Sequence, residues 1–176
     1  QGQLGAVVEQ AQALTVQYPE AFIIWNIVGA ANKGLGRVQA ASEALNKVTE
    51  LNPAYPDGFN NLGVVLQDQG KLEEAIASFN KALSLKPDYA EAYNNMGNAL
   101  QDQGKLEEAI VSYNKALSLK PEYAEAWSNG AEVLEKWNKL NELGLWLERA
   151  VQILEPVPSD ISFMKAKLLW RNKDTQ

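Results

Sequence analysis

The chain has 176 residues and a formal net charge of −6, and it contains neither cysteine nor histidine. The missing residue types exclude disulfides, zinc sites built from thiolates or imidazoles, and catalysis by histidine. The acidic balance disfavours DNA and RNA as partners, because a protein that follows a phosphate backbone needs a basic stripe.

A repeat of 34 residues organises the sequence. Residues 66–87 and 100–121 are identical at 20 of 22 positions and differ only at Ala77/Val111 and Phe79/Tyr113. Self-similarity at a fixed period of this size is the signature of a repeat architecture, in which each unit packs on its neighbours. We therefore expect the function to lie on a surface that the copies build together.

The register follows from one aromatic residue at position 4 of each copy: Trp25, Phe59, Tyr93 and Trp127. This register divides the chain into four full repeats: residues 22–55, 56–89, 90–123 and 124–157. Residues 1–21 match the second helix of an earlier, truncated repeat, and residues 158–176 match the first helix of a further one. The chain therefore starts and stops in mid-repeat, and we expect it to be a fragment of a longer protein.

Within each repeat, apolar residues fall at helical spacing in two segments, which predicts two helices. The segments are separated at position 15, where glycine permits the positive φ that ends a helix: Gly36, Gly70 and Gly104. Small residues at positions 8 and 20 let the two helices approach closely. Proline at position 32 closes the second helix.

The fourth repeat departs from this pattern. Gly130 and Ala131 invert the usual order at positions 7 and 8, Asn138 replaces glycine at position 15, and Trp146 stands at an unusual position. We therefore expect irregular packing after about residue 130.

The residues that recur resemble the tetratricopeptide repeat (TPR) family. They are an aromatic residue at position 4, Leu at 7, Gly at 8 and 15, Ala at 20, an aromatic residue at 24, Ala at 27 and Pro at 32. The resemblance covers nearly the whole chain. It implies an all-α fold of about ten helices, namely a right-handed α-solenoid of antiparallel helix pairs, and it implies a protein-interaction module.

Positions 2, 6, 9 and 13 share one side of the first helix, because each residue advances about 100°. In a TPR superhelix the first helices line the concave groove, so we interpret the polar members as candidate peptide-groove residues: Asp57, Asn61, Asp68, Glu91, Asn95, Asn98, Asp102, Glu125, Asn129 and Glu132. In the first repeat the same positions are Ile23, Ile27, Ala30 and Gly34.

Acidic side chains place most of the net charge on this strip. Like charges in a concavity attract cationic partners, so we expect a polar or basic protein or peptide as the partner. The alternative is a solvated face that only keeps the protein in solution, and the sequence leaves both interpretations open.

Three asparagines recur at one-repeat spacing: Asn61, Asn95 and Asn129. A carboxamide offers a donor and an acceptor together, which match the N–H and C=O groups of a peptide backbone. The row is similar to the asparagine ladder in the TPR arm of O-linked N-acetylglucosamine transferase. Asparagine is also common at this position throughout the TPR family, so ligand contact and a family feature both stay open. At position 5, Asn26, Asn60 and Asn94 either widen the ladder or bond the neighbouring helix.

Nothing in the sequence predicts a catalytic site, a metal site or a cofactor. The pairs Glu73–Glu74 and Glu107–Glu108 begin second helices, where acidic side chains suit the helix dipole. The longest apolar runs are too short to span a bilayer, so we expect a cytoplasmic protein with no membrane partner. The leading hypothesis is a non-enzymatic module that binds an extended peptide in an acidic, asparagine-lined groove.

Two alternatives stay open. Residues 146–173 are similar to repeats that precede transferase domains in bacterial TPR proteins, including sulfotransferases. This likeness favours a substrate-recruiting arm of a larger bacterial sulfo- or glycosyltransferase. Half-repeats at both ends would leave uncapped hydrophobic faces, which favours a self-assembling scaffold through homo-association of the chain ends.

Overall fold

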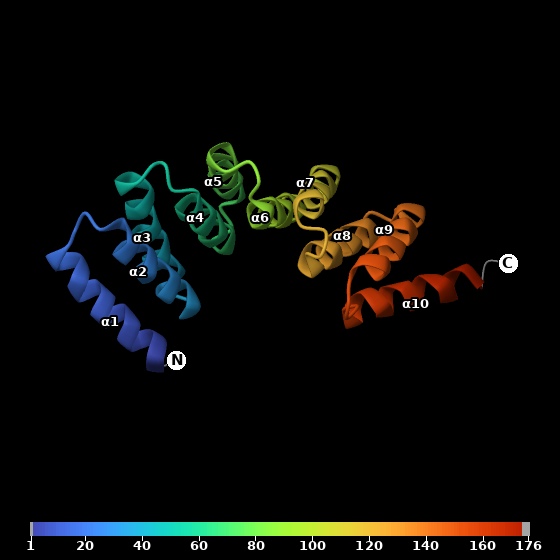
Figure 1. Cartoon of the computed structure of the whole chain (residues 1–176), viewed down its shortest axis with the longest axis horizontal. Coiled ribbons are helices and arrows are strands. Elements are labelled where there is room, and N and C mark those ends of the chain that lie inside the picture. Colours follow the sequence, from blue (N-terminus) through green and yellow to red (C-terminus); the bar gives the residue numbers. More distant parts are fainter. Residues whose placement is uncertain (1, 174–176) are drawn as a thin grey trace. The chain divides into compact units, whose positions relative to one another are not determined.

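The computed structural model describes residues 2–173 and the side chains of residues 3–169. Residue 1 and residues 174–176, at the ends of the predicted partial repeats, lie outside the described part. Residues 2–173 form ten α-helices and no strand, which confirms the predicted all-α class (Figure 1). The chain packs as two units, residues 1–87 and residues 88–176.

Unit 1 contains five helices: α1 (Gly2–Gln17), α2 (Phe22–Gly34), α3 (Val38–Leu51), α4 (Pro56–Asp68) and α5 (Leu72–Leu85). Each helix packs against the next one along the chain, and α2 also touches α4. Short turns join the helices, so neighbours in sequence run in opposite directions and α2 and α4 run the same way.

Unit 2 contains the other five: α6 (Ala90–Asp102), α7 (Leu106–Leu119), α8 (Ala124–Lys136), α9 (Leu140–Ile153) and α10 (Ser159–Lys173). Consecutive helices again pack together, α6 touches α8, and α8 touches α10. In both units, therefore, the first helices of successive repeats lie beside one another.

The turn inside each helix pair depends on one residue with positive φ. Its φ is 72° at Gly36, 73° at Gly70, 78° at Gly104 and 58° at Asn138. The N–H of the following residue then reaches back to the helix, as when Lys71 donates to the carbonyl of Leu66 at 2.9 Å. This is the Schellman arrangement that glycine favours, and asparagine is the side chain that best tolerates it.

The close approach of the paired helices depends on a second set of glycines. A Cβ added to Gly63 would lie 2.6 Å from the Phe79 ring, and one on Gly97 would lie 2.5 Å from the Tyr113 ring. Both rings are completely buried. Glycine at position 8 therefore makes the space that the aromatic residue at position 24 fills.

The fourth repeat keeps this contact by moving both partners by one residue. Gly130, at position 7, faces Trp146, at position 23, and a Cβ on Gly130 would overlap the indole. The Trp146 indole N–H donates to the carbonyl of Trp127 at 2.8 Å, and the two rings meet edge to face at 5.1 Å. The inverted glycine and the displaced tryptophan thus compensate each other.

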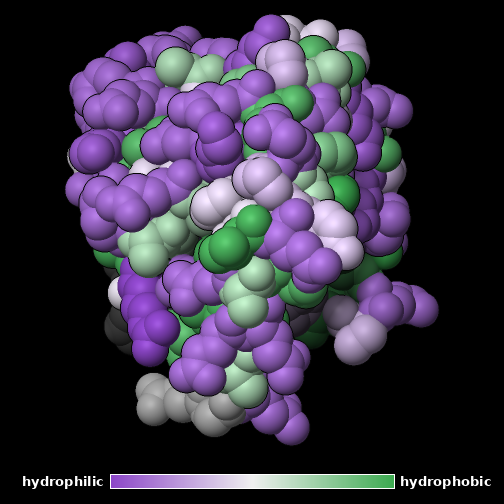
Figure 2. All heavy atoms as spheres, turned by 90° about the vertical axis from the view of Figure 1, so that its left-hand side faces the viewer, coloured by the Kyte–Doolittle hydropathy of each residue, from purple (hydrophilic) through white to green (hydrophobic). Residues whose placement is uncertain are grey.

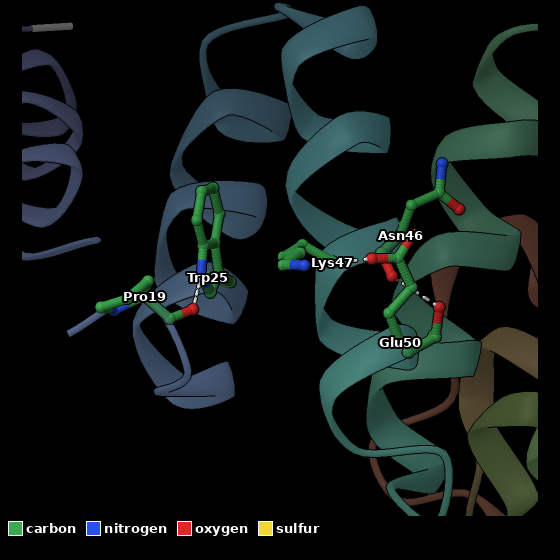
Figure 3. A network of polar contacts seen from close by, with 6 residues as sticks. Pro19, Trp25, Asn46, Lys47 and Glu50 are labelled. Carbon is green, nitrogen blue, oxygen red and sulfur yellow. Dashed lines mark hydrogen bonds and ion pairs between the residues drawn. The ribbon is translucent and has the colours of Figure 1, made fainter. Parts of the chain in front are cut away.

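Tryptophan at position 4 ties a first helix to the segment before it. The Trp25 indole N–H donates to the carbonyl of Pro19 at 2.8 Å (Figure 3), and Trp127 donates to Pro121 at 2.7 Å. Figure 3 also shows Lys47 and Glu50 on α3, whose ion pair of 3.3 Å is solvent-exposed. Exposed pairs of this kind contribute little to stability.

Helix α1 exposes apolar side chains on one side. Leu4, Val7 and Leu14 are each about two-fifths exposed. Figure 2, which views unit 1 from its α1 end, shows apolar atoms in scattered patches among hydrophilic ones. Within residues 2–173, no helix combines the length and the apolar character that crossing a membrane requires.

Candidate functional site

The ten candidate residues all lie on first helices. Helix α4 carries Asp57, Asn61 and Asp68; α6 carries Glu91, Asn95, Asn98 and Asp102; and α8 carries Glu125, Asn129 and Glu132. Four of them are exposed (Asp68, Asp102, Glu125 and Glu132), and the other six are half-buried. Their spacing places them on one side of each helix. Their role in ligand binding stays a prediction.

In unit 2, hydrogen bonds connect two of these asparagines across three helices. Asn129 of α8 donates from its amide nitrogen to the side-chain oxygens of Asn94 (3.1 Å) and Asn98 (3.0 Å), both on α6. The Tyr113 hydroxyl of α7 donates to the same Asn98 oxygen at 2.8 Å and lies 3.1 Å from a Gln101 oxygen. A single cluster of polar side chains therefore joins α6, α7 and α8.

These bonds determine what each carboxamide can offer a ligand. The two N–H groups of Asn129 are engaged, so this side chain is limited to accepting through its oxygen. The oxygen of Asn98 already accepts two hydrogen bonds, so that side chain offers N–H donors. The donor and the acceptor that we expected from one asparagine are thus divided between two asparagines on neighbouring helices.

In unit 1 a hydrogen bond of the same kind joins α4 to α2. Asn61 of α4 donates to the side-chain oxygen of Asn26 on α2 at 3.2 Å. At the position equivalent to Asn98, unit 1 has Ala30 on α2 and Val64 on α4. At the position equivalent to Tyr113, α5 has Phe79. The two units therefore present different hydrogen-bonding groups from the same scaffold.

Sequence reasoning left two contributors unassigned. Asn94 is completely buried, accepts from Asn129 and donates to Glu125 at 3.1 Å, which is the helix-bonding alternative for position 5. Tyr113 differs from Phe79 at the equivalent position, but the repeat pattern does not indicate a partner for its hydroxyl. The available signal was that position 9 changes together with position 24, from Val64/Phe79 to Asn98/Tyr113.

Lysines pair with two of the acidic candidates. Lys120 lies 3.4 Å from Glu91, and Lys136 lies 2.6 Å from Glu132. Both pairs are about half exposed, and exposed pairs contribute at most about 1 kcal/mol. A cationic ligand can therefore compete with these lysines at small cost.

Two tyrosines beside the acidic strip hold their protons more tightly than usual. Burial, followed by the charges of Glu125 and Glu91, raises the pKa of Tyr123 to about 12. Burial and the neighbouring Asp57 carboxylate, which accepts a hydrogen bond from the hydroxyl, raise the pKa of Tyr55. In both tyrosines burial is the larger cause, and a carboxylate at position 2 adds to it.

Two sequence families cover the centre of the chain. Residues 34–70 and 65–104 match a TPR repeat family, and residues 90–123 match the tetratricopeptide repeat family. Together these matches span residues 34–123. The chain is a tetratricopeptide repeat protein. No curated protein sequence matches it.

Solved structures agree on the TPR fold. The chain is similar to MamA residues 41–end from Desulfovibrio magneticus RS-1, with 19% identity, a TM-score of 0.79 and coverage of 86% of both chains. It is also similar to YrrB, described as a TPR protein with an unusual peptide-binding site, with 19% identity, a TM-score of 0.75 and coverage of 94% of this chain and 84% of YrrB.

A third similar structure contains a ligand. The first TPR of Spaghetti (RPAP3), bound to the HSP90 peptide SRMEEVD, shares 24% identity at a TM-score of 0.64, over 66% of this chain and 93% of that one. These likenesses confirm the predicted TPR solenoid class. The matches to the TPR family support, at the coarse level of a protein-interaction module, the class of function that we predicted.

Proposed function

We propose that the first-helix face of this TPR protein binds an extended, polar or basic peptide. The observation that carries the proposal is that Asn129 donates to Asn94 and Asn98, which leaves the Asn129 oxygen to accept from a ligand and the Asn98 N–H groups to donate to one. An extended residue presents its own N–H and C=O to the same side of the strand. The Asn129 oxygen on α8 is the complementary acceptor for the peptide N–H, and the Asn98 amide on α6 is the complementary donor for the peptide C=O.

The charges beside this pair favour ligands that donate hydrogen bonds. Glu125 and Glu132 lie on the same side of α8 as Asn129, and both are exposed. Carboxylates accept hydrogen bonds and attract lysine or arginine. Each neutral hydrogen bond adds only about 0.5–1.5 kcal/mol net. Useful affinity therefore needs hydrogen bonds from several first helices together with charged contacts.

The test is a peptide array followed by solution affinity measurements. Peptides rich in lysine and arginine are expected to bind. Neutralising the face with Glu125→Gln/Glu132→Gln should lower the affinity for these peptides severalfold. The loss should appear mainly in the association rate and should shrink at high salt, because rim charges steer encounter.

The chain offers a matched control. Glu107→Gln/Glu108→Gln removes the same two charges from α7, outside the proposed face, and both residues are exposed. The proposal predicts that this control keeps wild-type affinity. Equal losses in the two double variants would show that only net charge matters, and the proposed face would then be wrong.

A second candidate function is association between copies of the chain. The exposed Leu4, Val7 and Leu14 on α1, together with Phe163 and Leu169 on α10, form apolar surfaces of the kind that partners cover. The mass measured by light scattering should then rise with protein concentration. A constant monomer mass would exclude this function.

The proposal of a substrate-recruiting arm of a larger transferase is tested by the coding sequence that surrounds this chain. The cytoplasmic location stays a prediction that cell fractionation tests.

A further inference from the structure

The first repeat presents an apolar version of the proposed groove. Helix α2 exposes Ile23 (49%) and Ile27 (44%), and the next residue on that side, Ala30, is also exposed. These are positions 2, 6 and 9, which carry acids and carboxamides in the third and fourth repeats. Exposed isoleucines at these positions are costly in water, so a covering ligand would gain free energy there.

Within unit 1, helix α4 carries acidic and hydrogen-bonding side chains next to the apolar side chains of α2. Helix α4 touches α2, and Asn61 of α4 donates to Asn26, the neighbour of Ile27. Asp57, four residues before Asn61 on α4, is half-buried and keeps carboxylate lone pairs beyond its bond with Tyr55. Apolar and anionic groups therefore meet at the α2–α4 boundary.

Asn61 keeps more hydrogen-bonding groups for a ligand than Asn129 does. In unit 2 the second N–H of Asn129 bonds the side chain at position 9 of the preceding first helix, Asn98. In unit 1 that position holds Ala30, which has no polar side-chain atom. Asn61 can thus present both an N–H donor and its oxygen to one peptide residue.

We propose that α2 and α4 form a composite subsite with a defined ligand preference. An apolar side chain covers Ile23, Ile27 and Ala30, the peptide backbone bonds Asn61, and a lysine or arginine approaches Asp57. This inference rests on the proposed function and adds the identity and order of the ligand side chains. The occupant is therefore a segment that carries one apolar and one basic residue.

The helix spacing sets the distance between those two residues. Packed helices lie about 8–10 Å apart, and an extended chain rises about 3.3 Å per residue. Moving from the α2 rung to the α4 rung therefore takes about three residues of peptide. An apolar and a basic side chain at that separation should bind best.

The experiment measures binding of labelled Gly-Ser peptides to the intact chain by fluorescence anisotropy. Each peptide contains one leucine and one lysine, in both orders, at every separation up to about twice the expected three residues. Replacing the leucine of the best peptide by serine should weaken binding about tenfold, because a leucine buried on the isoleucines gains that much.

Two variants separate the parts of the subsite. Ile27→Asn, which gives the first repeat the asparagine of the other three, should abolish the tenfold leucine preference. Asp57→Asn should keep that preference and reduce the dependence on lysine severalfold. The matched control is Leu145→Asn on α9, a residue that is 61% exposed and lies outside the groove, and it should behave like the wild type.

The possible outcomes distinguish this inference from the proposed function. Binding that ignores leucine, or a leucine preference that survives Ile27→Asn, overturns the subsite and leaves the proposed function standing. No binding by any peptide at about 1 mM overturns both. A concentration-dependent dimer that Ile27→Asn abolishes would show that a second copy covers this face, and would also overturn the subsite.

Discussion

Exchanging the hydrogen-bonded Tyr113–Asn98 pair for the pair found in the preceding repeat gives a direct test of the unit 2 cluster. The second repeat has Val64 and Phe79 at the equivalent positions. The change is therefore Asn98→Val and Tyr113→Phe, made singly and together. We expect each single change to destabilise unit 2 and the double change to cost less than the sum.

The magnitudes follow from the contacts. Tyr113→Phe removes one hydroxyl from a fully buried ring without leaving a cavity, and the Asn98 oxygen still accepts from Asn129. The loss should therefore be that of one hydrogen bond, about 1 kcal/mol. Asn98→Val also removes the bond from Asn129 and leaves the Tyr113 hydroxyl with Gln101 at 3.1 Å, so it should cost about 1–3 kcal/mol.

Hydrogen exchange of the α6, α7 and α8 amides, followed by mass spectrometry, reports on these helices separately from unit 1. This local measurement suits a repeat protein, whose unfolding need not be two-state. In the double variant the hydroxyl and its acceptor are both absent, so the coupling energy should be about 1 kcal/mol.

The converse exchange serves as the control. Val64→Asn/Phe79→Tyr should introduce a comparable favourable coupling between the two new side chains in unit 1. A coupling within about 0.3 kcal/mol of zero in unit 2 would mean that the Tyr113–Asn98 bond contributes nothing, and the reasoning about carboxamide orientation would fail.

Four further measurements test the fold and its electrostatics. Gly104→Ala should cost about 1–2 kcal/mol in urea unfolding, purely from its positive φ, because an added Cβ meets no atom within 4 Å; a neutral effect would contradict the turn geometry. Gly97→Ala should cost about 1–3 kcal/mol for a different reason, the contact with Tyr113 at 2.5 Å, and Tyr113→Leu should relieve part of it. Asn138→Gly should stabilise the chain by up to about 1 kcal/mol, seen as a higher urea midpoint, since φ there is 58°. Finally, Tyr123 ionises near its usual value of 10.0 when unfolded and near 12 when folded, so its contribution to stability is complete below pH 10 and is lost as pH rises through about 12; Tyr123→Phe should make alkaline unfolding less steep, and an unchanged profile would count against the raised pKa.

The helix pairs and turns could be predicted from sequence because their causes are local. Glycine at position 15 adopts the positive φ that ends a helix without a steric penalty, and asparagine is the side chain that best tolerates it, as at Asn138. The packing of the fourth repeat could not be predicted in this way. Gly130 and Trp146 each look irregular alone, and only their contact shows that one shift compensates the other.

The candidate site could be predicted as a set of positions but not as a set of chemical groups. Helical spacing placed the asparagines on one side of their helices. Whether a carboxamide donates or accepts depends on neighbours more than 30 residues away, as when Asn129 bonds Asn94 and Asn98. Periodicity does not encode that orientation, so the sequence predicts a row of equivalent asparagines, whereas Asn61 and Asn129 have different hydrogen-bond partners.

This difference between the units has a physical consequence for recognition. Asn129 is held by two hydrogen bonds, so ordering it on binding costs little conformational entropy, but it can no longer donate. Asn61 donates to Asn26, and position 9 of the preceding first helix is Ala30, which has no polar side-chain atom, so Asn61 can both donate and accept. In the proposed binding mode, the residue at position 9, either alanine or an asparagine that accepts from Tyr113, would therefore determine whether the asparagine of the next first helix only accepts a ligand's hydrogen bond or both donates and accepts. A repeat protein that varies this position can change ligand chemistry along its groove while the glycines and aromatic residues that pair its helices stay the same.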